Sequence, residues 1–446
     1  MISHEDTIFA IATAPGRGGV QVFRLSGGGA GQALSALGAA QALKQPRKAV
    51  LASLSDPASD EVIDKGLVLW FPGPASFTGE DVAELHLHGG RAVAEAMTSA
   101  LSALPGLRLA EPGEFSRRAF EHGKMDLTEA EAVADLVDAE TAAQRRQALR
   151  QMDGALGQLY HGWADRLTRA LAHIEADLDF PDEDLPDGVV PTVMPLINDV
   201  TTAMRDHLSD NQRGERLRSG FSVALIGPPN AGKSSLLNAL AARDAAIVSE
   251  QAGTTRDVIE VAMDLGGWPV TLADTAGLRD AADQIEDEGV RRAKARAEQA
   301  DLKLAVFDSR DWPDLDADVL KLLDQDTLVI FNKSDLAQVT DKQIGDVPAL
   351  AISAQTGEGL QTLTKRLSVE IERRFAPSET PSLTRARHRA ALTEALEHLE
   401  RLPQAPLPEL AAEDCRLALR ALGRITGRVD VEDLLDVIFR DFCIGK

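Results

Sequence analysis

The stretch GPPNAGKSS, which begins at Gly227 and follows the apolar run SVALI, constrains the fold more than any other part of the chain. Its spacing, Gly-x4-Gly-Lys-Ser, is completed by Gly232, Lys233 and Ser234 and is typical of a phosphate-binding loop between a strand and a helix. In such a loop, backbone N–H groups hold phosphates, the lysine reaches the β- and γ-phosphates, and the serine hydroxyl binds Mg²⁺. The sequence therefore predicts a parallel α/β nucleotide-binding domain.

Two further motifs supply the groups expected near the metal and the γ-phosphate. GTTRD offers Thr255 as a second Mg²⁺ ligand. DTAG follows the apolar run VTLA, so that Asp274 would hold the metal through water and the Gly277 N–H would meet the γ-phosphate. The next residue, Leu278, has no hydrogen-bonding group with which to orient an attacking water. That task must then fall to another residue.

A third motif, NKSD, selects the base. Guanine presents two adjacent donors, which the single carboxylate of Asp335 can accept together, whereas adenine has no such pair. Asn332 and the stem of Lys333 would complete the pocket, and Ser353 lies in the loop expected near the guanine O6. The order of these motifs, each at the end of an apolar run, predicts binding of GTP.

The expected GTP contacts come from several loops, with Ser234 and Thr255 also as Mg²⁺ ligands. They are Asn230, Ala231, Gly232, Lys233, Ser234, Ser235, Ser249, Glu250, Gln251, Ala252, Gly253, Thr254, Thr255, Asp274, Thr275, Ala276, Gly277, Asn332, Lys333, Asp335, Ser353 and Ala354.

Outside the predicted α/β segment, the pattern of apolar residues differs from one part of the chain to the next. Short apolar runs separated by glycine-rich turns come first and predict an α+β domain, and leucine and alanine at helical spacing follow. Thr128 with Glu131 has the pattern of a capping box at the start of these helices. Long amphipathic helices return after the α/β segment, which is therefore expected to be inserted into a helical domain. The predicted division is 1–119, 120–215, 216–376 and 377–446.

The formal net charge of -23 confines any RNA contact to a local basic patch. Arg145, Arg146 and Arg150, together with residues 385–389, are candidate phosphate contacts, although solvated helix faces would explain them equally well.

Cysteine usage and hydropathy bear on the compartment. Cys415 and Cys443 cannot form a disulfide framework, and no run of about 18 apolar residues occurs. We therefore expect a cytoplasmic protein. Cys443, four residues from the end, could be a nucleophile, but a packed thiol is the more common fate.

Motifs outside the α/β segment give the chain a family resemblance. The GTPase motifs are accompanied by PGRGG, FPGPASFTGEDVAELHLHGG, PGEFSRRAF, KMDLTEAEAVADLVDAE and the terminal FCIGK. Together these motifs resemble those of the MnmE (TrmE) tRNA modification GTPases over nearly the whole chain. The resemblance implies a folate-binding-like α+β domain that dimerises, a discontinuous helical domain and an inserted P-loop GTPase domain. It also implies a heterotetramer with an MnmG-type FAD protein that modifies carbon 5 of the wobble uridine of certain tRNAs.

The same resemblance implies an answer to the question that Leu278 raises. In this family a potassium ion beside the phosphates supplies positive charge, and G domains pair across it. By position, the K⁺ ligands would be the Asn230 side chain and carbonyls of Ser249, Gln251 and Thr254, and the catalytic residue that positions water would be Glu286. From the residues alone, Glu286 is one of several acids in its segment.

A tetrahydrofolate site is implied at the amino-terminal domain. Its residues would be Arg24, Glu84, Lys124 and Lys446, and the ligand 5-formyl- or 5,10-methylene-tetrahydrofolate, the one-carbon donor. Alternatively, Arg24 and Glu84 pair with each other on a strand face. His86 and His88 could form half of a metal site, but no third ligand is evident in the sequence.

Two functions remain open at this point. The first is a GTPase that works in tRNA modification. The second is a regulatory or ribosome-assembly GTPase that binds RNA without modification chemistry. The folate-like segment and the CIGK tail favour the first, because an assembly GTPase would need neither.

Overall fold

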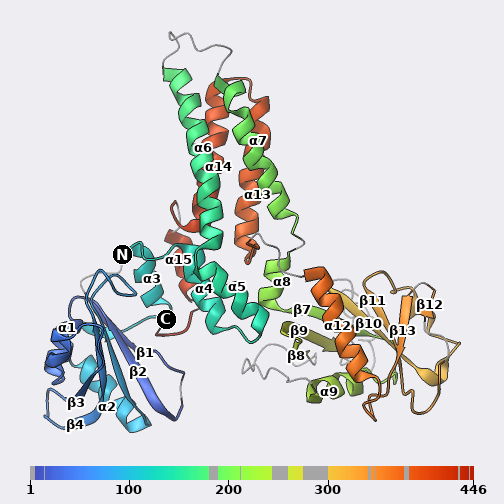
Figure 1. Ribbon diagram of the computed structural model, residues 1–446, viewed down its shortest axis with the longest axis horizontal. Coiled ribbons are helices and arrows are strands. Elements are labelled where there is room, and N and C mark those ends of the chain that lie inside the picture. Colours follow the sequence, from blue (N-terminus) through green and yellow to red (C-terminus); the bar gives the residue numbers. More distant parts are fainter. Residues whose placement is uncertain are drawn as a thin grey trace, which may run out of the picture. The chain divides into compact units, whose positions relative to one another are not determined.

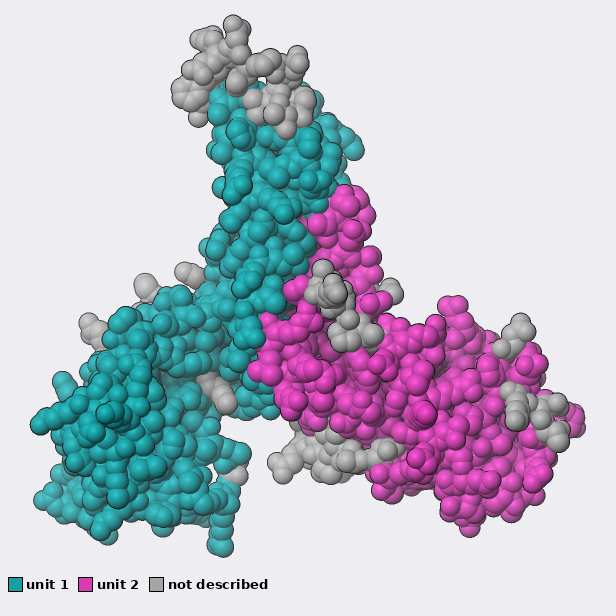
Figure 2. All heavy atoms as spheres, in the orientation of Figure 1, with its two compact units in different colours: residues 1–137, 151–201, 394–446 teal, residues 138–150, 202–393 magenta. Residues whose placement is uncertain are grey.

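The computed structural model describes most of the chain and divides it into two compact units, coloured separately in Figure 2. Unit 1 comprises residues 1–137, 151–201 and 394–446, and unit 2 comprises 138–150 and 202–393. The described residues are 6–14, 16–179, 189–210, 212–243, 260–274, 300–339, 343–345, 347–375, 381–429, 432–440 and 442–445.

The amino-terminal part of unit 1 is built on a six-stranded sheet with the order β3-β4-β5-β2-β1-β6 (Figure 1). Neighbouring strands are antiparallel, apart from the parallel pair β1 and β6. The strands are β1 (Thr7–Ile11), β2 (Gly18–Ser26), β3 (Val50–Ser55), β4 (Val62–Phe71), β5 (Val82–Gly89) and β6 (Leu107–Leu109). Buried residues alternate with more exposed ones along β3 and β5, which is the pattern of a sheet with one face on the core.

Helices and a short 3-10 helix accompany this sheet. They are α1 (Ala30–Ala36), η1 (Ala40–Lys44), α2 (Arg91–Ser102) and α3 (Glu114–Glu121). Leu34 of α1 and Met97 and Leu101 of α2 pack with Phe23 and Leu85 of the sheet in one buried cluster. The α+β architecture expected for this segment is confirmed.

Long helices form the rest of unit 1. They are α4 (Leu127–Val137), α6 (Ala155–Asp179), α14 (Pro408–Thr426) and α15 (Glu432–Arg440). In Figure 1, α6 and α14 run side by side, and the buried Cys415 thiol of α14 donates to the Leu167 carbonyl of α6 at 3.5 Å. Two of the four boundaries between the units fall within α7 (Val189–Leu208) and α13 (Ala386–Arg401), a third falls within α5 (Ala142–Met152), and the fourth directly follows α4.

The start of α4 differs from the sequence prediction. Asp126 Oδ1 accepts the Glu129 backbone N–H at 2.9 Å, and Glu129 Oε2 accepts the Asp126 N–H at 2.6 Å. This reciprocal pair is the capping box, whereas Thr128 and Glu131 are buried within the helix at 0% and 1% exposure. The prediction of Thr128 and Glu131 was wrong by two residues, because an aspartate caps as well as a threonine and both patterns occur here.

Unit 2 is built on a seven-stranded sheet with the order β12-β13-β11-β10-β7-β9-β8, whose five central strands are parallel. The edge strands β12 and β8 pair antiparallel. The strands are β7 (Phe221–Ile226), β8 (Glu260–Leu265), β9 (Trp268–Asp274), β10 (Leu302–Asp308), β11 (Thr327–Asn332), β12 (Gln343–Ile344) and β13 (Val347–Ala351). Every residue of β10 and β11 is buried, as expected for the centre of a parallel sheet.

Apolar side chains cover both faces of this sheet. Leu236 and Leu240 of α9 and Leu363 of α12 belong to one buried cluster, while Phe307 and Phe331 belong to another. The helical elements of unit 2 outside α7 and α13 are α5 (Ala142–Met152), α8 (Arg213–Ser219), α9 (Lys233–Arg243), η2 (Ser309–Asp311), α11 (Ala317–Leu320) and α12 (Leu360–Phe375). The predicted α/β nucleotide-binding fold is therefore present.

No helix among the described residues is both long enough and apolar enough to span a bilayer. The predicted division at residues 119, 215 and 376 stays a prediction.

Candidate functional site: a nucleotide pocket and an amino-terminal ion-pair site

The phosphate-binding loop lies between β7 and α9, as the sequence predicts. Gly227 has a φ of +150°, and a Cβ there would lie 2.2 Å from the Val306 carbonyl oxygen of β10, so only glycine fits. The Lys233 ammonium donates to the carbonyls of Gly227 and Pro228, both at 2.8 Å. Ser234 stands exposed at the start of α9, with Ser235 beside it. The loop therefore presents the helix N-terminus and its hydroxyl groups to solvent.

Asn332, at the end of β11, joins three loops of the predicted nucleotide site. Its side-chain Nδ2 donates to the Ala231 carbonyl at 2.9 Å, and its Oδ1 accepts the Ala354 N–H at 3.0 Å. Gly232 allows this approach, because a Cβ there would lie 2.2 Å from Asn332 Nδ2. Asn332 is 1% exposed, so both hydrogen bonds are shielded from water. The phosphate loop and the predicted base-recognition loops are thereby fixed to one another.

Lys333 connects the same two regions from the other side. Its ammonium donates to the Asn230 carbonyl at 2.6 Å and to Asp308 Oδ2 at 2.7 Å. Lys333 and Asn230 both have left-handed backbones, with φ of +62° and +61°, which is uncommon for residues with a side chain. Such conformations gather at ligand sites, where the surrounding structure holds them.

Asp308, the last residue of β10, was missed by the sequence reasoning. Its carboxylate accepts hydrogen bonds from Arg310 and Lys333, and these bonds hold the pKa of Asp308 far below its ordinary value in spite of burial. The signal that could have found it is its place at the carboxyl end of a central parallel strand, where ligands of α/β sheets bind.

The remaining base-recognition residues lie at the ends of β11 and β13. Asp335 is exposed, so its carboxylate can meet a ligand. Ser353 is fully buried, and its Oγ accepts the Thr356 N–H at 3.1 Å. The Ser334 N–H donates to the Ile352 carbonyl at 3.0 Å, which joins the two loops. The predicted guanine contacts therefore face one edge of the sheet.

Several predicted site residues lie outside the described residues, and Asp274 ends β9 with its side chain not described. Those outside are Ser249, Glu250, Gln251, Ala252, Gly253, Thr254, Thr255, Thr275, Ala276, Gly277, Glu286 and Lys446.

In the amino-terminal domain, Arg24 of β2 and Glu84 of β5 are cross-strand neighbours. Arg24 Nη2 lies 3.2 Å from Glu84 Oε1, so the expected alternative, that the two pair with each other, is confirmed. His86 Nε2 lies 3.2 Å from the other Glu84 oxygen. These side chains are only partly buried, which leaves the pair accessible to a ligand.

Two aromatic rings flank the Arg24 guanidinium and were also missed from sequence. The guanidinium carbon (Cζ) of Arg24 lies 5.4 Å from the ring centroid of Phe77 and 5.8 Å from the ring centroid of Phe115, which are cation–π distances. Phe77 is 37% exposed, whereas Phe115 is fully buried. The rings lie in the motifs PASFTGE and PGEFS, and an aromatic residue two positions from a glycine in each motif was a readable signal.

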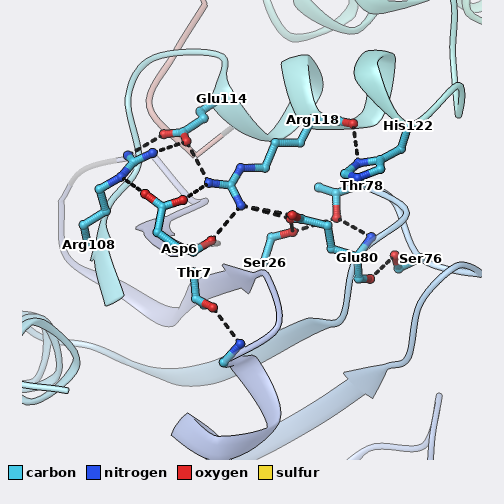
Figure 3. Close-up of polar contacts among 11 residues, drawn as sticks. Asp6, Thr7, Ser26, Ser76, Thr78, Glu80, Arg108, Glu114, Arg118 and His122 are labelled. Atoms are coloured by element: carbon cyan, nitrogen blue, oxygen red, sulfur yellow. Dashed lines mark hydrogen bonds and ion pairs between the residues drawn. The ribbon is translucent and has the colours of Figure 1, made fainter. Parts of the chain in front are cut away.

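A buried charge network fixes the two segments that carry these rings (Figure 3). Arg118 of α3, 2% exposed, pairs with Asp6 at 2.8 Å, Glu80 at 3.1 Å and Glu114 at 3.0 Å. Glu80 Oε2 also accepts the Ser26 hydroxyl at 2.6 Å. Because Glu80 lies in the loop of Phe77 and Glu114 lies in the helix of Phe115, one arginine ties both to the sheet.

Arg108, which is more exposed than Arg118, also belongs to this network. It pairs with Asp6 and Glu114, each at 2.5 Å. Burial alone would raise the pKa of Glu114, but its hydrogen bonds, of which that from Arg108 is the largest contribution, lower it overall.

The carboxyl-terminal tail lies against this domain within unit 1. Ile444 forms an antiparallel bridge with Pro112, and a Cβ on Gly445 would lie 2.4 Å from the Ile11 carbonyl oxygen. Ile11 is one residue beyond Ala10, the β1 partner of Arg24. Lys124, another predicted folate residue, donates to the Pro74 carbonyl at 3.0 Å in the loop of Phe77.

Two of the candidate contacts for a metal ion or RNA, His88 and Arg389, pair with acidic side chains. His88 pairs with Asp64 at 2.9 Å, and the described residues contain no group of three potential metal ligands. Arg389 is engaged with Asp210 at 2.7 Å and with Glu215. Arg145, Arg146 and Arg150 are exposed on α5.

Comparison with known proteins agrees with this arrangement. The model of the GTP-binding protein TrmE N-terminus matches residues 7–124, and that of the MnmE helical domain matches 127–443. The tRNA modification GTPase MnmE of Paramagnetospirillum magneticum is 60% identical over 442 residues, which cover 99% of this chain and 100% of that protein. The chain belongs to the MnmE family of tRNA modification GTPases.

More distant members of the MnmE family include a mitochondrial protein of Danio rerio, the 5-taurinomethyluridine-[tRNA] synthase subunit GTPB3. It is 49% identical over 469 residues, which cover 99% of this chain and 93% of that protein. Among solved structures, the G domain of the T. maritima FeoB iron transporter is 28% identical, with a TM-score of 0.27, and covers 34% of this chain and 97% of that chain.

Proposed function

We propose that this chain is a K⁺-activated GTP hydrolase that works with an MnmG-type flavoprotein. Together they install a (carboxymethyl)aminomethyl group at carbon 5 of the wobble uridine of certain tRNAs, with a tetrahydrofolate derivative as the one-carbon donor. The observation that carries the proposal is the set of hydrogen bonds by which Asn332 and Lys333 join the phosphate loop to the base-recognition loops, in a chain of the MnmE family. The name of the Danio rerio relative, a subunit of a 5-taurinomethyluridine synthase, supports both the uridine and the need for a partner.

GTP would bind at the carboxyl edge of the unit 2 sheet. Asp335 would accept the two adjacent donors of guanine, and the loop that begins at Gly227 would surround the phosphates. Ser234 and Thr255 would hold Mg²⁺, which neutralises phosphate charge when bound. The exposed hydroxyl of Ser234 at the start of α9 fits this role.

A potassium ion would take the place of the charge that an arginine finger supplies elsewhere. Asn230 fits as its ligand, because its left-handed backbone places an exposed side chain on the phosphate loop. Carbonyls of Ser249, Gln251 and Thr254 would complete the set of oxygen ligands, which hard cations prefer. Glu286 would position the attacking water, since Leu278 has no group that could do so.

The folate derivative would bind around Arg24. Glu84 would accept donors of the pterin, while Lys124 and Lys446 would hold the glutamate tail. The arginine flanked by Phe77 and Phe115 fits a planar ligand, because both an aromatic face and charged groups are present. The contact of Ile444 and Gly445 with this domain supports a role for the terminal lysine.

The wider organisation follows the family expectation. We propose a cytoplasmic homodimer formed through residues 1–119, a helical domain from 120–215 and 377–446, and a G domain at 216–376 whose copies pair during hydrolysis. A ribosome-assembly GTPase without modification chemistry would have no need of the ion-pair site around Arg24.

The K⁺ and Glu286 assignments can be tested in one hydrolysis assay in KCl and in NaCl at equal ionic strength. We expect faster turnover in KCl, and we expect Asn230→Ala to remove that difference while GTP binding is retained. Asn238→Ala, a change on the exposed side of α9, serves as the matched control and should behave as wild type. Glu286→Ala should lower kcat with little change in affinity. Equal rates in both salts, or normal turnover of Glu286→Ala, would contradict these assignments.

The modification chemistry can be tested by reconstitution. The chain, the flavoprotein, tRNA, GTP, K⁺ and the folate derivative should together yield a C5-modified wobble uridine, detected by mass spectrometry of nucleosides. Omission of either protein should give none. Product formed without this chain would refute the proposal.

A further inference from the structure

Lys333 has a role in the proposed guanine pocket only if its long side chain is held in place. Its backbone is fixed at the end of β11, and its ammonium reaches the Asn230 carbonyl at 2.6 Å. The side chain is 26% exposed, so a single hydrogen bond to a carbonyl would leave the stem mobile in water. A flexible lysine loses side-chain entropy when a base packs on it, and an immobilised one does not.

Asp308 supplies the second attachment. Its Oδ2 lies 2.7 Å from the Lys333 ammonium, and the Asp308 side chain is only 6% exposed. A charge-assisted bond at this length and burial is stronger than a bond between neutral groups. The Lys333 stem is therefore fixed at both ends, by β11 and by this carboxylate.

Asp308 is itself a rigid acceptor. Its Oδ1 accepts the Arg310 backbone N–H at 3.0 Å, which caps η2, and the Arg310 guanidinium donates to both oxygens, the shortest bond being 2.6 Å. Its partner Arg310 is 55% exposed, and within the described part of the chain its side-chain hydrogen bonds all go to Asp308. The carboxylate thus cannot turn away from the lysine without losing other bonds.

We propose that Asp308 is a positioning residue for guanine nucleotides: it fixes the Lys333 stem in the place where the base packs. The proposal rests on the guanine pocket of the proposed function. Because guanine is common to GTP and GDP, Asp308 should affect binding of both equally and should not act on the bond that is cleaved.

Asp308→Asn is the informative variant, because the amide keeps the oxygen that caps η2 and removes the charge that holds Lys333. We expect the KM for GTP and the dissociation rate of GDP to rise about tenfold, with kcat at saturation changed less than about twofold. We expect the same rise of about tenfold in KM with ITP. Its base, hypoxanthine, differs from guanine only in lacking the exocyclic amine, whose hydrogen bond Asp335 would accept. Asp318→Asn is the matched control, because it removes one carboxylate charge from the exposed pair with Lys321 in the same unit, and it should keep the wild-type KM.

A double-mutant cycle separates positioning from a general structural effect. In a Lys333→Met background, Asp308→Asn should weaken GTP binding by less than about twofold, because the residue through which it acts is gone. Thermal melting should show all variants folded. An unchanged KM in Asp308→Asn, or the full additional weakening in the Lys333→Met background, would overturn the proposal.

Asp335→Asn tests the underlying pocket independently. It should shift preference from GTP toward xanthosine triphosphate, because an acceptor becomes a donor. If this shift occurs and Asp308→Asn has no effect, the pocket stands and only the role of Asp308 is refuted. If Asp335→Asn causes no shift, the pocket itself is refuted.

Discussion

Replacing Arg118 by methionine should unfold the amino-terminal domain at markedly lower temperature. Arg118 is 2% exposed, and its loss leaves Glu80, at 11% side-chain exposure, without its cationic partner. Breaking a buried ion pair by removing one partner costs about 3–5 kcal/mol. Arg108 still pairs with Glu114 and Asp6, so we expect the lower end, about 3 kcal/mol of unfolding free energy. For a domain of this size that corresponds to a fall in Tm of roughly 10–15 °C.

Arg117 on the same helix provides the matched control. It is 23% exposed and pairs with Glu121 and with Asp436, which is 74% exposed. Exposed pairs contribute at most about 1 kcal/mol, so Arg117→Met should shift Tm by only a few degrees. Differential scanning calorimetry of both full-length variants measures the difference. If the two variants melt together, the buried network does not stabilise the domain as we have argued.

The same network predicts an acid dependence. The pKa of Glu114 is lowered in the folded protein, so its contribution to stability is present above the ordinary carboxyl pKa and is lost as pH falls through the folded value. Because Arg118 is one of the groups that lower this pKa, the acid loss of stability should be shallower in Arg118→Met than in wild type.

Three further predictions concern other parts of the chain. Burial lowers the pKa of His207 to about 4, so the folded state keeps the ring neutral and loses stability as the pH falls below the ordinary pKa of histidine. In urea melts, the wild-type protein should therefore be less stable at about pH 5 than at about pH 7.5, and His207→Gln should remove about 2 kcal/mol of that difference. A thiol reagent should label the exposed Cys443 in the native protein but not Cys415, whose pKa burial raises to about 12. Removal of residues 443–446 should weaken tetrahydrofolate binding, measured by titration, and leave GTP hydrolysis intact; normal folate affinity in a folded truncation would refute a role for the tail.

The nucleotide-binding fold could be predicted from sequence because its signals are local. The phosphate loop, DTAG and NKSD each follow an apolar run of the length typical of a buried strand, and the order of Gly232, Asn332 and Ser353 brings them to one edge of a parallel sheet. Asn332 and Lys333 were predicted as pocket residues, but their bonds to Ala231 and Asn230 connect positions about a hundred residues apart, and no sequence spacing encodes them.

The features that could not be predicted from the sequence depend on tertiary contacts, or on a choice between two sequence patterns that match equally well. Asp308 is one of many acidic residues, and only the pairing of β10 with β11 places it beside Lys333. The pair of Arg24 with Glu84 was anticipated as an alternative, but Phe77 and Phe115 around the arginine were not, because they come from a loop and a helix that Arg118 brings together. The capping box at α4 was misplaced because two overlapping patterns were equally good.

The most direct test of the account is the modification of wobble uridine in cells. Mass spectrometry of nucleosides from total tRNA should show that deletion of the gene removes the C5-modified wobble uridine and that the wild-type chain restores it. The Glu286→Ala chain, expressed to the same level, should not restore it. An unchanged nucleoside profile in the deletion strain would contradict the central claim that this GTPase acts in tRNA modification.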